Sequence, residues 1–389
     1  MASKKSISID VEPKVLIWAY ETSGWSKEEL SKRIKINVEI FDRWLSGEVK
    51  PTLKQIEDLA RILKRPLAAF FLSEPPPEPS LPKDYRMLPD KVDKFDKKTL
   101  LAIRRARRLQ DISKELSENL DSNLNQKIAI HKVSEDPKKV AEEYRKEFNF
   151  TEETQKKTKG PYKLFSLLRE YIEDRNVFAF QISMPLDDAR GFALINGSPA
   201  IVVVNSRDTI EARIFTLMHE FGHIVLNEPG ISMPENSLFV NNVEKIEKWC
   251  NEFSSAFLLP ENIGKIIFSA NKEKLTDTKT LNKLSYTYKL SKAMLLYNMH
   301  KLNFISNEYY NEILERYKES QKKPLVQKEG KKGGFGAKAD QRVFNERGQK
   351  FVSLVANNME KGLITHSDAL SYLSTKLKNL NKIVSKAKK

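Results

Sequence analysis

Apolar residues recur at helical spacing over most of this 389-residue chain, and that spacing predicts amphipathic helices. Residues 13–72 contain four or five short helical runs, and longer stretches follow at 90–125 and 135–175. Another helix is predicted from Ser285 to Leu302. The pattern changes between 177 and 204, where short β-branched runs predict strands. We therefore expect a multidomain, mainly α protein with one small sheet.

The predicted strands are short and close together. Gly191 to Ile195 and Ala200 to Val204 are joined by Asn196-Gly197-Ser198-Pro199, and Asn-Gly between apolar runs is a strong hairpin signal. Val177 to Ile182 is a third apolar run. A sheet of this size either only packs against a helix or also offers an edge to an extended peptide. The sequence leaves both interpretations open.

The helix predicted after the strands is apolar on most sides, as buried helices are. Asp208 and Thr209 are residue types that cap a helix start, and the helix should stop near Asn227, before the breaker pair Pro229-Gly230. Its apolar positions are Ile214, Phe215, Leu217, Met218, Phe221, Ile224, Val225 and Leu226.

Residues 219–223 of this helix read His-Glu-Phe-Gly-His. Histidines at positions i and i+4 share one helix face and can bind one Zn²⁺. Glu220 would lie beside an activated water and take its proton as the water attacks a carbonyl. Polar groups in a buried helix need partners, which a metal ion supplies. The alternative is a surface helix that carries two histidines by chance.

A hydrolytic zinc site needs a third protein ligand. The next helical run, from about Val243 to Leu259, places Glu247 on its apolar side, where a carboxylate is costly unless it binds a cation. Asn251 lies one turn further and is predicted to orient a ligating histidine by a hydrogen bond. Glu244 is the alternative ligand. Two histidines and one glutamate favour Zn²⁺, and they would also accept Mn²⁺ or Fe²⁺.

These two helices together resemble the ImmA/IrrE family of zinc metallopeptidases. The resemblance is carried by Arg-Ile-Phe-Thr-Leu-Met-His-Glu-Phe-Gly-His-Ile-Val-Leu-Asn at 213–227 and by Glu-Lys-Trp-Cys-Asn-Glu-Phe-Ser-Ser-Ala-Phe-Leu-Leu-Pro at 247–260. It extends over roughly residues 160–315 and implies an α+β, zincin-like fold of the gluzincin type, with activity that is often released by stress or a cofactor protein. It also implies the roles of four residues: zinc ligation by His219, His223 and Glu247, and general-base catalysis by Glu220.

The N-terminal helices carry a different pattern. Ser26 begins a helix with a capping-box sequence, and Asn37 precedes a second helix, Val38–Leu45, which Ser46-Gly47 ends. Two short helices joined by a tight turn fit a helix-turn-helix, and this stretch resembles the XRE/Cro-type family. The resemblance implies that Val38–Leu45 enters the major groove of DNA. The candidate DNA-contacting residues are Asn37, Val38, Glu39, Asp42 and Arg43.

This stretch departs from the family pattern in three places. Lys35 stands where the turn usually has glycine, and Lys27 and Glu28 stand where the family often has glutamine. Glu39 and Asp42 would repel phosphate. The alternative is a helical domain that binds a protein partner or dimerises.

Charge and cysteine content limit the expected partners and the expected cellular compartment. The net charge of +15 favours a polyanionic partner such as nucleic acid, but the positive charge gathers in Arg104–Arg108 and at 350–389, outside the candidate recognition helix. The single cysteine, Cys250, excludes an internal disulfide framework and is predicted to be a small buried residue. Without a signal-peptide pattern or a long apolar run, we expect a cytoplasmic protein with no membrane span.

Pro-rich and Gly-rich stretches along the sequence predict how the chain divides into domains and linkers. The last 50 residues contain helical runs centred on 351–359 and 367–380, for which dimerisation or substrate docking is a hypothesis. The predicted parts are an XRE-type helix-turn-helix domain at 1–73, a Pro-rich linker at 74–89, a metallopeptidase domain at 90–315, a basic Gly-rich linker at 316–340 and a helical basic segment at 341–389.

Two functions follow from these patterns. In the first, a zinc metalloendopeptidase coupled to a DNA-binding module cleaves a regulatory protein, such as a repressor or an antitoxin, with Tyr286 or Tyr288 as a candidate transition-state stabiliser. In the second, the chain is a DNA-binding transcriptional regulator or the antitoxin of a toxin-antitoxin pair. Its zinc domain then serves as a sensor or a partner-binding platform.

Overall fold

The computed structural model describes residues 7–77, 95–124, 127–228, 231–232, 241–322 and 339–387. Most of the predicted Pro-rich linker at 74–89 and of the basic linker at 316–340 lies outside these residues. The contacts divide the described chain into two compact units, one up to Arg105 and the other from Ala106 onward. The division falls within α5 (Lys97–Glu118).

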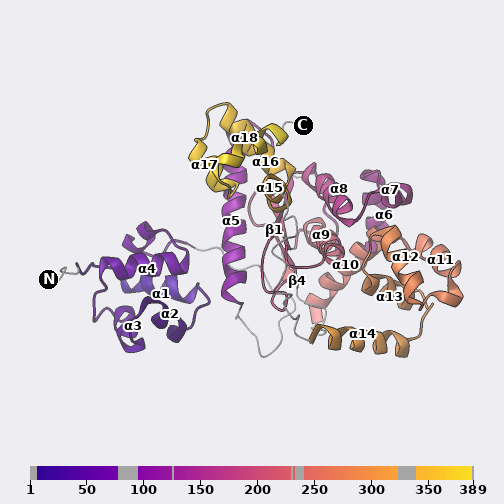
Figure 1. Cartoon of the computed structure of the whole chain (residues 1–389), viewed down its shortest axis with the longest axis horizontal. Coiled ribbons are helices and arrows are strands. Elements are labelled where there is room, and N and C mark those ends of the chain that lie inside the picture. Colours follow the sequence, from indigo (N-terminus) through magenta and orange to yellow (C-terminus); the bar gives the residue numbers. More distant parts are fainter. Residues whose placement is uncertain are drawn as a thin grey trace. The chain divides into compact units, whose positions relative to one another are not determined.

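The N-terminal unit is helical, as its apolar spacing predicts (Figure 1). Side-chain caps define its helix starts: the Ser26 hydroxyl accepts from the Glu29 amide, and Thr52 and Gln55 form a reciprocal capping box. The helices are α1 (Pro13–Glu21), α2 (Lys27–Ile34), α3 (Val38–Leu45), α4 (Leu53–Leu63) and the 3₁₀ helix η1 (Leu67–Phe71). Their buried core includes Leu16, Leu30, Phe41, Trp44, Ile56, Leu59 and Phe70.

The turn between α2 and α3 is tight. Lys35 has a left-handed φ of 59°, a conformation that costs a non-glycine residue roughly 1–2 kcal/mol. The Ile36 amide donates to the carbonyl of Ser31 at 3.0 Å and closes the turn. Lys35 therefore adopts the turn conformation for which the helix-turn-helix pattern usually has glycine.

The second unit contains a sheet in the order β1-β3-β2-β4. β1 (Val177–Ile182) runs parallel to β3 (Ala200–Asn205), and β2 (Gly191–Leu194) runs antiparallel to β3. Leu194 pairs with Ile201, which confirms the predicted hairpin. β4 (Ile231–Ser232) adds a short pairing to β2. β1, β2 and β3 are buried along their whole length, which explains why these segments read as continuous apolar runs rather than alternating ones.

Helices cover this sheet in layers. α8 packs on β1, α9 packs on β2 and β3, and α10 packs between α9 and α6. The bounds are α6 (Pro137–Glu147), α7 (Glu152–Lys157), α8 (Pro161–Glu173), α9 (Ile210–Val225), α10 (Asn241–Leu258), α11 (Glu261–Ser269), η3 (Lys272–Lys274), α12 (Thr278–Tyr288), α13 (Lys292–Lys301) and α14 (Asn307–Lys322).

The helix predicted from Ser285 to Leu302 is wrong, because the chain breaks between α12 and α13. Lys289 adopts a left-handed φ of 57° there. Its buried ammonium group donates to the carbonyls of Gln155, Lys156 and Thr287 at 2.7–2.8 Å. These long-range contacts from α7 override the helical spacing, which local sequence alone cannot reveal.

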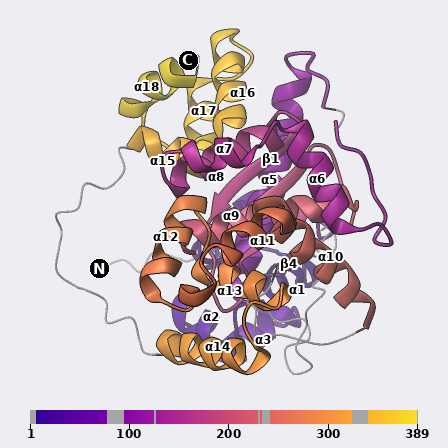
Figure 2. The ribbon, with the colours of Figure 1, turned by 90° about the vertical axis from the view of Figure 1, so that its right-hand side faces the viewer.

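The C-terminal region also differs from the prediction of two helices. It forms α15 (Ala339–Arg347), α16 (Gln349–Glu360), α17 (His366–Tyr372) and α18 (Leu377–Ala387), so the predicted 367–380 run is split. Left-handed residues at Gly348 and Ser374 separate helices here. These helices belong to the second unit, with α15 against β1 and α16 against α8 (Figure 2).

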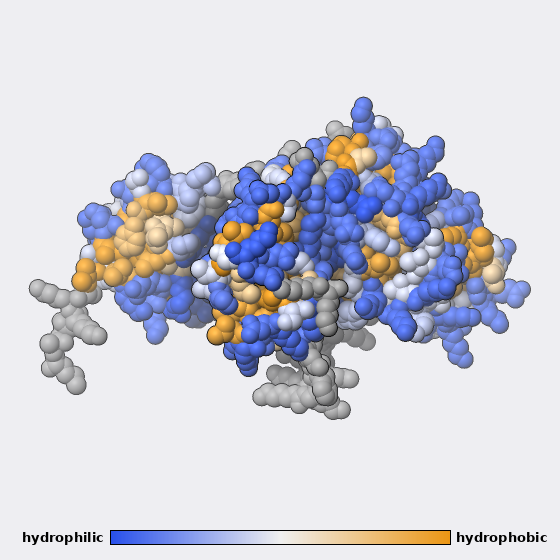
Figure 3. Space-filling model, turned by 90° about the horizontal axis from the view of Figure 1, so that it is seen from above, coloured by the Kyte–Doolittle hydropathy of each residue, from blue (hydrophilic) through white to orange (hydrophobic). Residues whose placement is uncertain are grey.

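The surface agrees with the composition. On the face shown in Figure 3, apolar side chains occur in separate patches within a largely hydrophilic surface. Among the residues that the structure describes, no helix is long and apolar enough to cross a membrane.

Candidate metal centre

α9 brings the His-Glu-x-x-His residues into the core. The Thr209 hydroxyl accepts from the Ala212 amide and caps the helix start, and the helix ends at Val225, two residues before the predicted end near Asn227. His219, Glu220 and His223 are each at most 2% exposed. A helix that packs on a sheet on one side and on α10 on the other has no solvated face in this segment, which explains its nearly continuous apolar sequence.

Gly222 lets α10 approach α9 closely. A Cβ atom at this position would lie 3.3 Å from Cys250 Sγ and 3.3 Å from Phe253 Cδ1. Since ordinary van der Waals contacts are longer, a larger side chain would push the helices apart. The close crossing places Glu247, one turn before Cys250, opposite the two histidines. Cys250 is fully buried, as predicted.

The three predicted ligands meet at one point. His219 Nε2 lies 3.3 Å from His223 Nε2 and 3.2 Å from Glu247 Oε2, and His223 Nε2 lies 3.1 Å from Glu247 Oε1. Zinc bonds of roughly 2.0–2.2 Å at tetrahedral angles would separate ligand atoms by about 3.3–3.5 Å. The two imidazole nitrogens and the carboxylate are therefore of the right type and spacing for a zinc ion held by three protein ligands.

A backbone carbonyl orients His223. Its Nδ1 atom lies 3.1 Å from the carbonyl oxygen of Glu228, which can only accept, so Nδ1 carries the proton and Nε2 faces the other ligands. This contact cannot be predicted from sequence, because any residue can supply a backbone carbonyl. Asn251 lies half-buried on α10, and its orienting role stays a prediction. The Glu244 side chain lies outside those that the structure describes.

None of the three candidate ligands carries a permanent positive charge, so the pKa values of His223 and Glu247 depend on one another. Burial raises the pKa of Glu247, but the facing imidazoles of His219 and His223 outweigh it and hold this pKa well below its ordinary value. Burial lowers the pKa of His223, but Cys250 and Glu247 outweigh it and hold this pKa well above its ordinary value. The carboxylate and the imidazoles thus favour each other's charged forms, and a bound metal ion would supply the same positive charge.

Glu220 lies where a strand comes very close to α9. A Cβ atom on Gly191 of β2 would lie 2.5 Å from Thr216 Cγ2 and 3.1 Å from Glu220 Oε1. Only glycine fits between this strand and the helix at that point. The Gly191 and Gly222 contacts were not predicted, because a glycine's role in close packing depends on which element faces it.

The candidate stabilising tyrosines have other surroundings. The Tyr288 hydroxyl donates to the Glu152 carboxylate at 2.7 Å, which ties α12 to α7. Tyr286 is 81% exposed. Of the remaining histidines, the His131 amide donates to Val225 O, and the His300 ring stacks on Tyr310.

The candidate DNA-contacting residues lie on or beside α3, and all but the half-buried Val38 are exposed. Asp42 pairs with Lys27 at 2.6 Å, and Arg43 pairs with Glu48 at 3.3 Å. Residues 7–77 contain eleven acidic and eleven basic side chains, so the positive net charge of the chain comes from elsewhere.

Comparison with known proteins bears on the second unit. No curated protein and no solved structure matches the chain. Residues 172–300 match the model of a peptidase family, Peptidase_M78, described as the IrrE N-terminal-like domain. The matched segment contains β1, β2, β3, α9 and α10, and with them His219, Glu220, His223 and Glu247, so this region is similar to ImmA/IrrE-type metallopeptidases.

Proposed function

We propose that this chain is a zinc-dependent metalloendopeptidase that cleaves a regulatory protein, such as a repressor or an antitoxin. One observation carries the proposal: His219, His223 and Glu247 bring their ligand atoms together within 4.8 Å inside a segment that matches a peptidase family. Glu220 follows His219 directly in the same buried helix.

The residues divide the work between holding a cation and moving a proton. His219, His223 and Glu247 would hold Zn²⁺. When bound, this ion acts as a Lewis acid: it polarises a carbonyl and lowers the pKa of a water molecule towards neutrality. The Glu228 carbonyl keeps the His223 ring in the ligating tautomer. Glu220 accepts the proton of the attacking water and passes it to the leaving amine.

Metal analysis is the first test. We expect one zinc per chain in the purified wild type and a loss of zinc in His219→Ala and Glu247→Ala. Glu220→Ala should keep the metal and lose roughly 10²- to 10⁴-fold in cleavage rate, measured on proteins encoded beside this gene. Glu211→Ala, the same change in the first turn of α9, is the matched control. Full cleavage by the Glu220 variant would disprove the mechanism.

We propose further that the N-terminal unit binds DNA through α3. The support is the short α2–turn–α3 arrangement, with exposed polar side chains on α3. Because Glu48 holds Arg43, Glu48→Ala should release this side chain and strengthen binding to a duplex of the upstream region, whereas Arg43→Ala should weaken it. If neither variant nor the wild type binds DNA, the proposal is wrong, and the exposed face of α3 would instead bind a protein partner or a second copy of the chain.

The burial of the site favours a second function. The three ligands and Glu220 are each at most 4% exposed in the described conformation, and a site this enclosed would also suit a metal sensor or a partner-binding platform with little turnover. In that case the chain would act as a DNA-binding regulator or an antitoxin. Stable, uncleaved association of the wild type with a toxin-like neighbour would support this function over proteolysis.

A further inference from the structure

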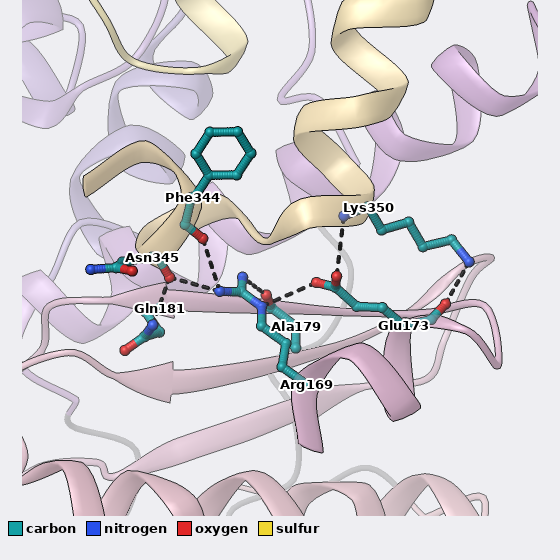
Figure 4. A network of polar contacts seen from close by, with 7 residues as sticks. All are labelled: Arg169, Glu173, Ala179, Gln181, Phe344, Asn345 and Lys350. Atoms are coloured by element: carbon teal, nitrogen blue, oxygen red, sulfur yellow. Dashed lines mark hydrogen bonds and ion pairs between the residues drawn. The ribbon is translucent and has the colours of Figure 1, made fainter. Parts of the chain in front are cut away.

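The C-terminal helices join the rest of the second unit through a buried ion pair. Arg169 and Glu173, on consecutive turns of α8, pair at 3.1 Å and are at most 5% exposed. Arg169 Nη1 also donates to the carbonyls of Phe344 and Asn345 at 3.2 and 2.7 Å. Figure 4 shows the guanidinium group between α8, β1 and the end of α15.

The start of α16 completes this junction. The Lys350 amide donates to Glu173 Oε2 at 3.1 Å, and the Lys350 ammonium group donates to the Glu173 carbonyl and to Asn176 Oδ1. Gly348 lies so close that a Cβ atom there would be 2.1 Å from Glu173 Oε1. The backbone at 344–350 is therefore fitted to α8 and is not a loosely attached tail.

Gln181 extends the junction to the helix that carries the candidate metal ligands. Its Nε2 donates to the Asn345 carbonyl at 2.6 Å, and its Oε1 accepts from Arg213 Nη1 at 2.6 Å. Arg213 lies on α9 six residues before His219, which is about 9 Å along the helix axis. Gln181 itself is only 6% exposed, and both of its hydrogen bonds are partly buried, where they are stronger than fully exposed ones.

We propose that α15–α18 act as a built-in clamp on α9, and that Gln181 is the positioning residue that transmits the clamp to the metal-binding helix. The amide group is suited to this role because it donates on one side and accepts on the other. A carboxylate of the same size can only accept. The consequence for metal binding rests on the proposed function, whereas the mechanical coupling does not.

Hydrogen exchange of the full-length, metal-free protein tests the clamp directly. Gln181→Glu keeps an acceptor for Arg213 but places a carboxylate against the Asn345 carbonyl. We expect faster amide exchange at 344–350 and also in α9. Arg213→Met should speed exchange in α9 and leave 344–350 protected. Lys386→Ala is the control, because Lys386 pairs with Asp340 inside the C-terminal helices and should leave α9 unchanged.

Zinc affinity gives the second readout, by competition with a coloured chelator. We expect Gln181→Glu to weaken zinc binding by about 2- to 30-fold, the range found for residues that couple distant sites, and Lys386→Ala to leave it unchanged. Unchanged exchange in α9 while 344–350 loses protection would overturn the clamp. A wild type that binds no zinc would instead contradict the proposed function, and the exchange result would still stand.

Discussion

The second unit buries two charged clusters that handle their charge in different ways. The cluster around Arg169 contains its own cations, and carbonyls and a carboxylate surround the guanidinium group. The cluster of His219, His223 and Glu247 gains positive charge only by taking up a proton or an external cation. A buried cluster that supplies its own counter-charge holds structure together, whereas one that must import a cation is suited to chemistry.

The same substitution in both clusters should have the largest and most contrasting effect. Glu173→Gln leaves the Arg169 guanidinium buried without its carboxylate, and because arginine does not give up its proton, we expect a loss of about 3–5 kcal/mol in unfolding free energy. Glu247→Gln in metal-free protein leaves imidazoles that can become neutral, so the loss should be about 1 kcal/mol. Urea unfolding of both variants measures the difference; equal losses would break the comparison.

Substitution of one glycine beside each cluster should have effects of intermediate size and sharpen the comparison. Gly348 has a φ of 82°, and its added Cβ would meet Glu173 and Arg169 well inside contact distance, so Gly348→Ala should cost at least about 1–3 kcal/mol. Gly222→Ala meets atoms at 3.3 Å, and the gain in helix propensity of about 1 kcal/mol offsets part of the strain. We expect its main effect on zinc affinity, through the spacing of α9 and α10. Thermal unfolding and chelator competition separate these outcomes.

The exposed ion pairs of Glu261 should contribute least to the stability of the protein. Hydrogen bonds from Lys138 and Lys265 lower the pKa of Glu261 from 4.5 to about 2. A depressed pKa in the folded state stabilises the protein above about pH 4.5, and this contribution is lost as the pH falls towards 2. Because the Glu261 side chain is 38% exposed, solvent limits the effect of Glu261→Gln at pH 7 to about 0.2–1 kcal/mol. The difference from wild type should vanish near pH 2; a constant difference would contradict this explanation.

Features of this protein that depend on a few neighbouring residues are predictable from its sequence. The spacing of His219 and His223 on one helix, the Asn-Gly hairpin and the start of α2 at Ser26 each depend on a few neighbouring residues. The sequence predicts that Glu247 lies near a cation site because a carboxylate on an apolar helix face is costly unless it meets a cation, and its carboxylate does lie beside His219 and His223. The family resemblance around these helices agrees with the match over 172–300.

Only the tertiary structure decided what depends on distant partners. The bond from Gln181 to the Asn345 carbonyl spans 164 positions, and the break at Lys289 depends on carbonyls more than 130 positions away. The orientation of His223 depends on a backbone carbonyl that any residue could supply. Periodicity and residue type determine helices and candidate ligands, because these are short-range properties. Which surfaces meet, and therefore that the C-terminal helices belong to the unit with the candidate metal ligands, follows from packing between segments that the sequence does not place side by side.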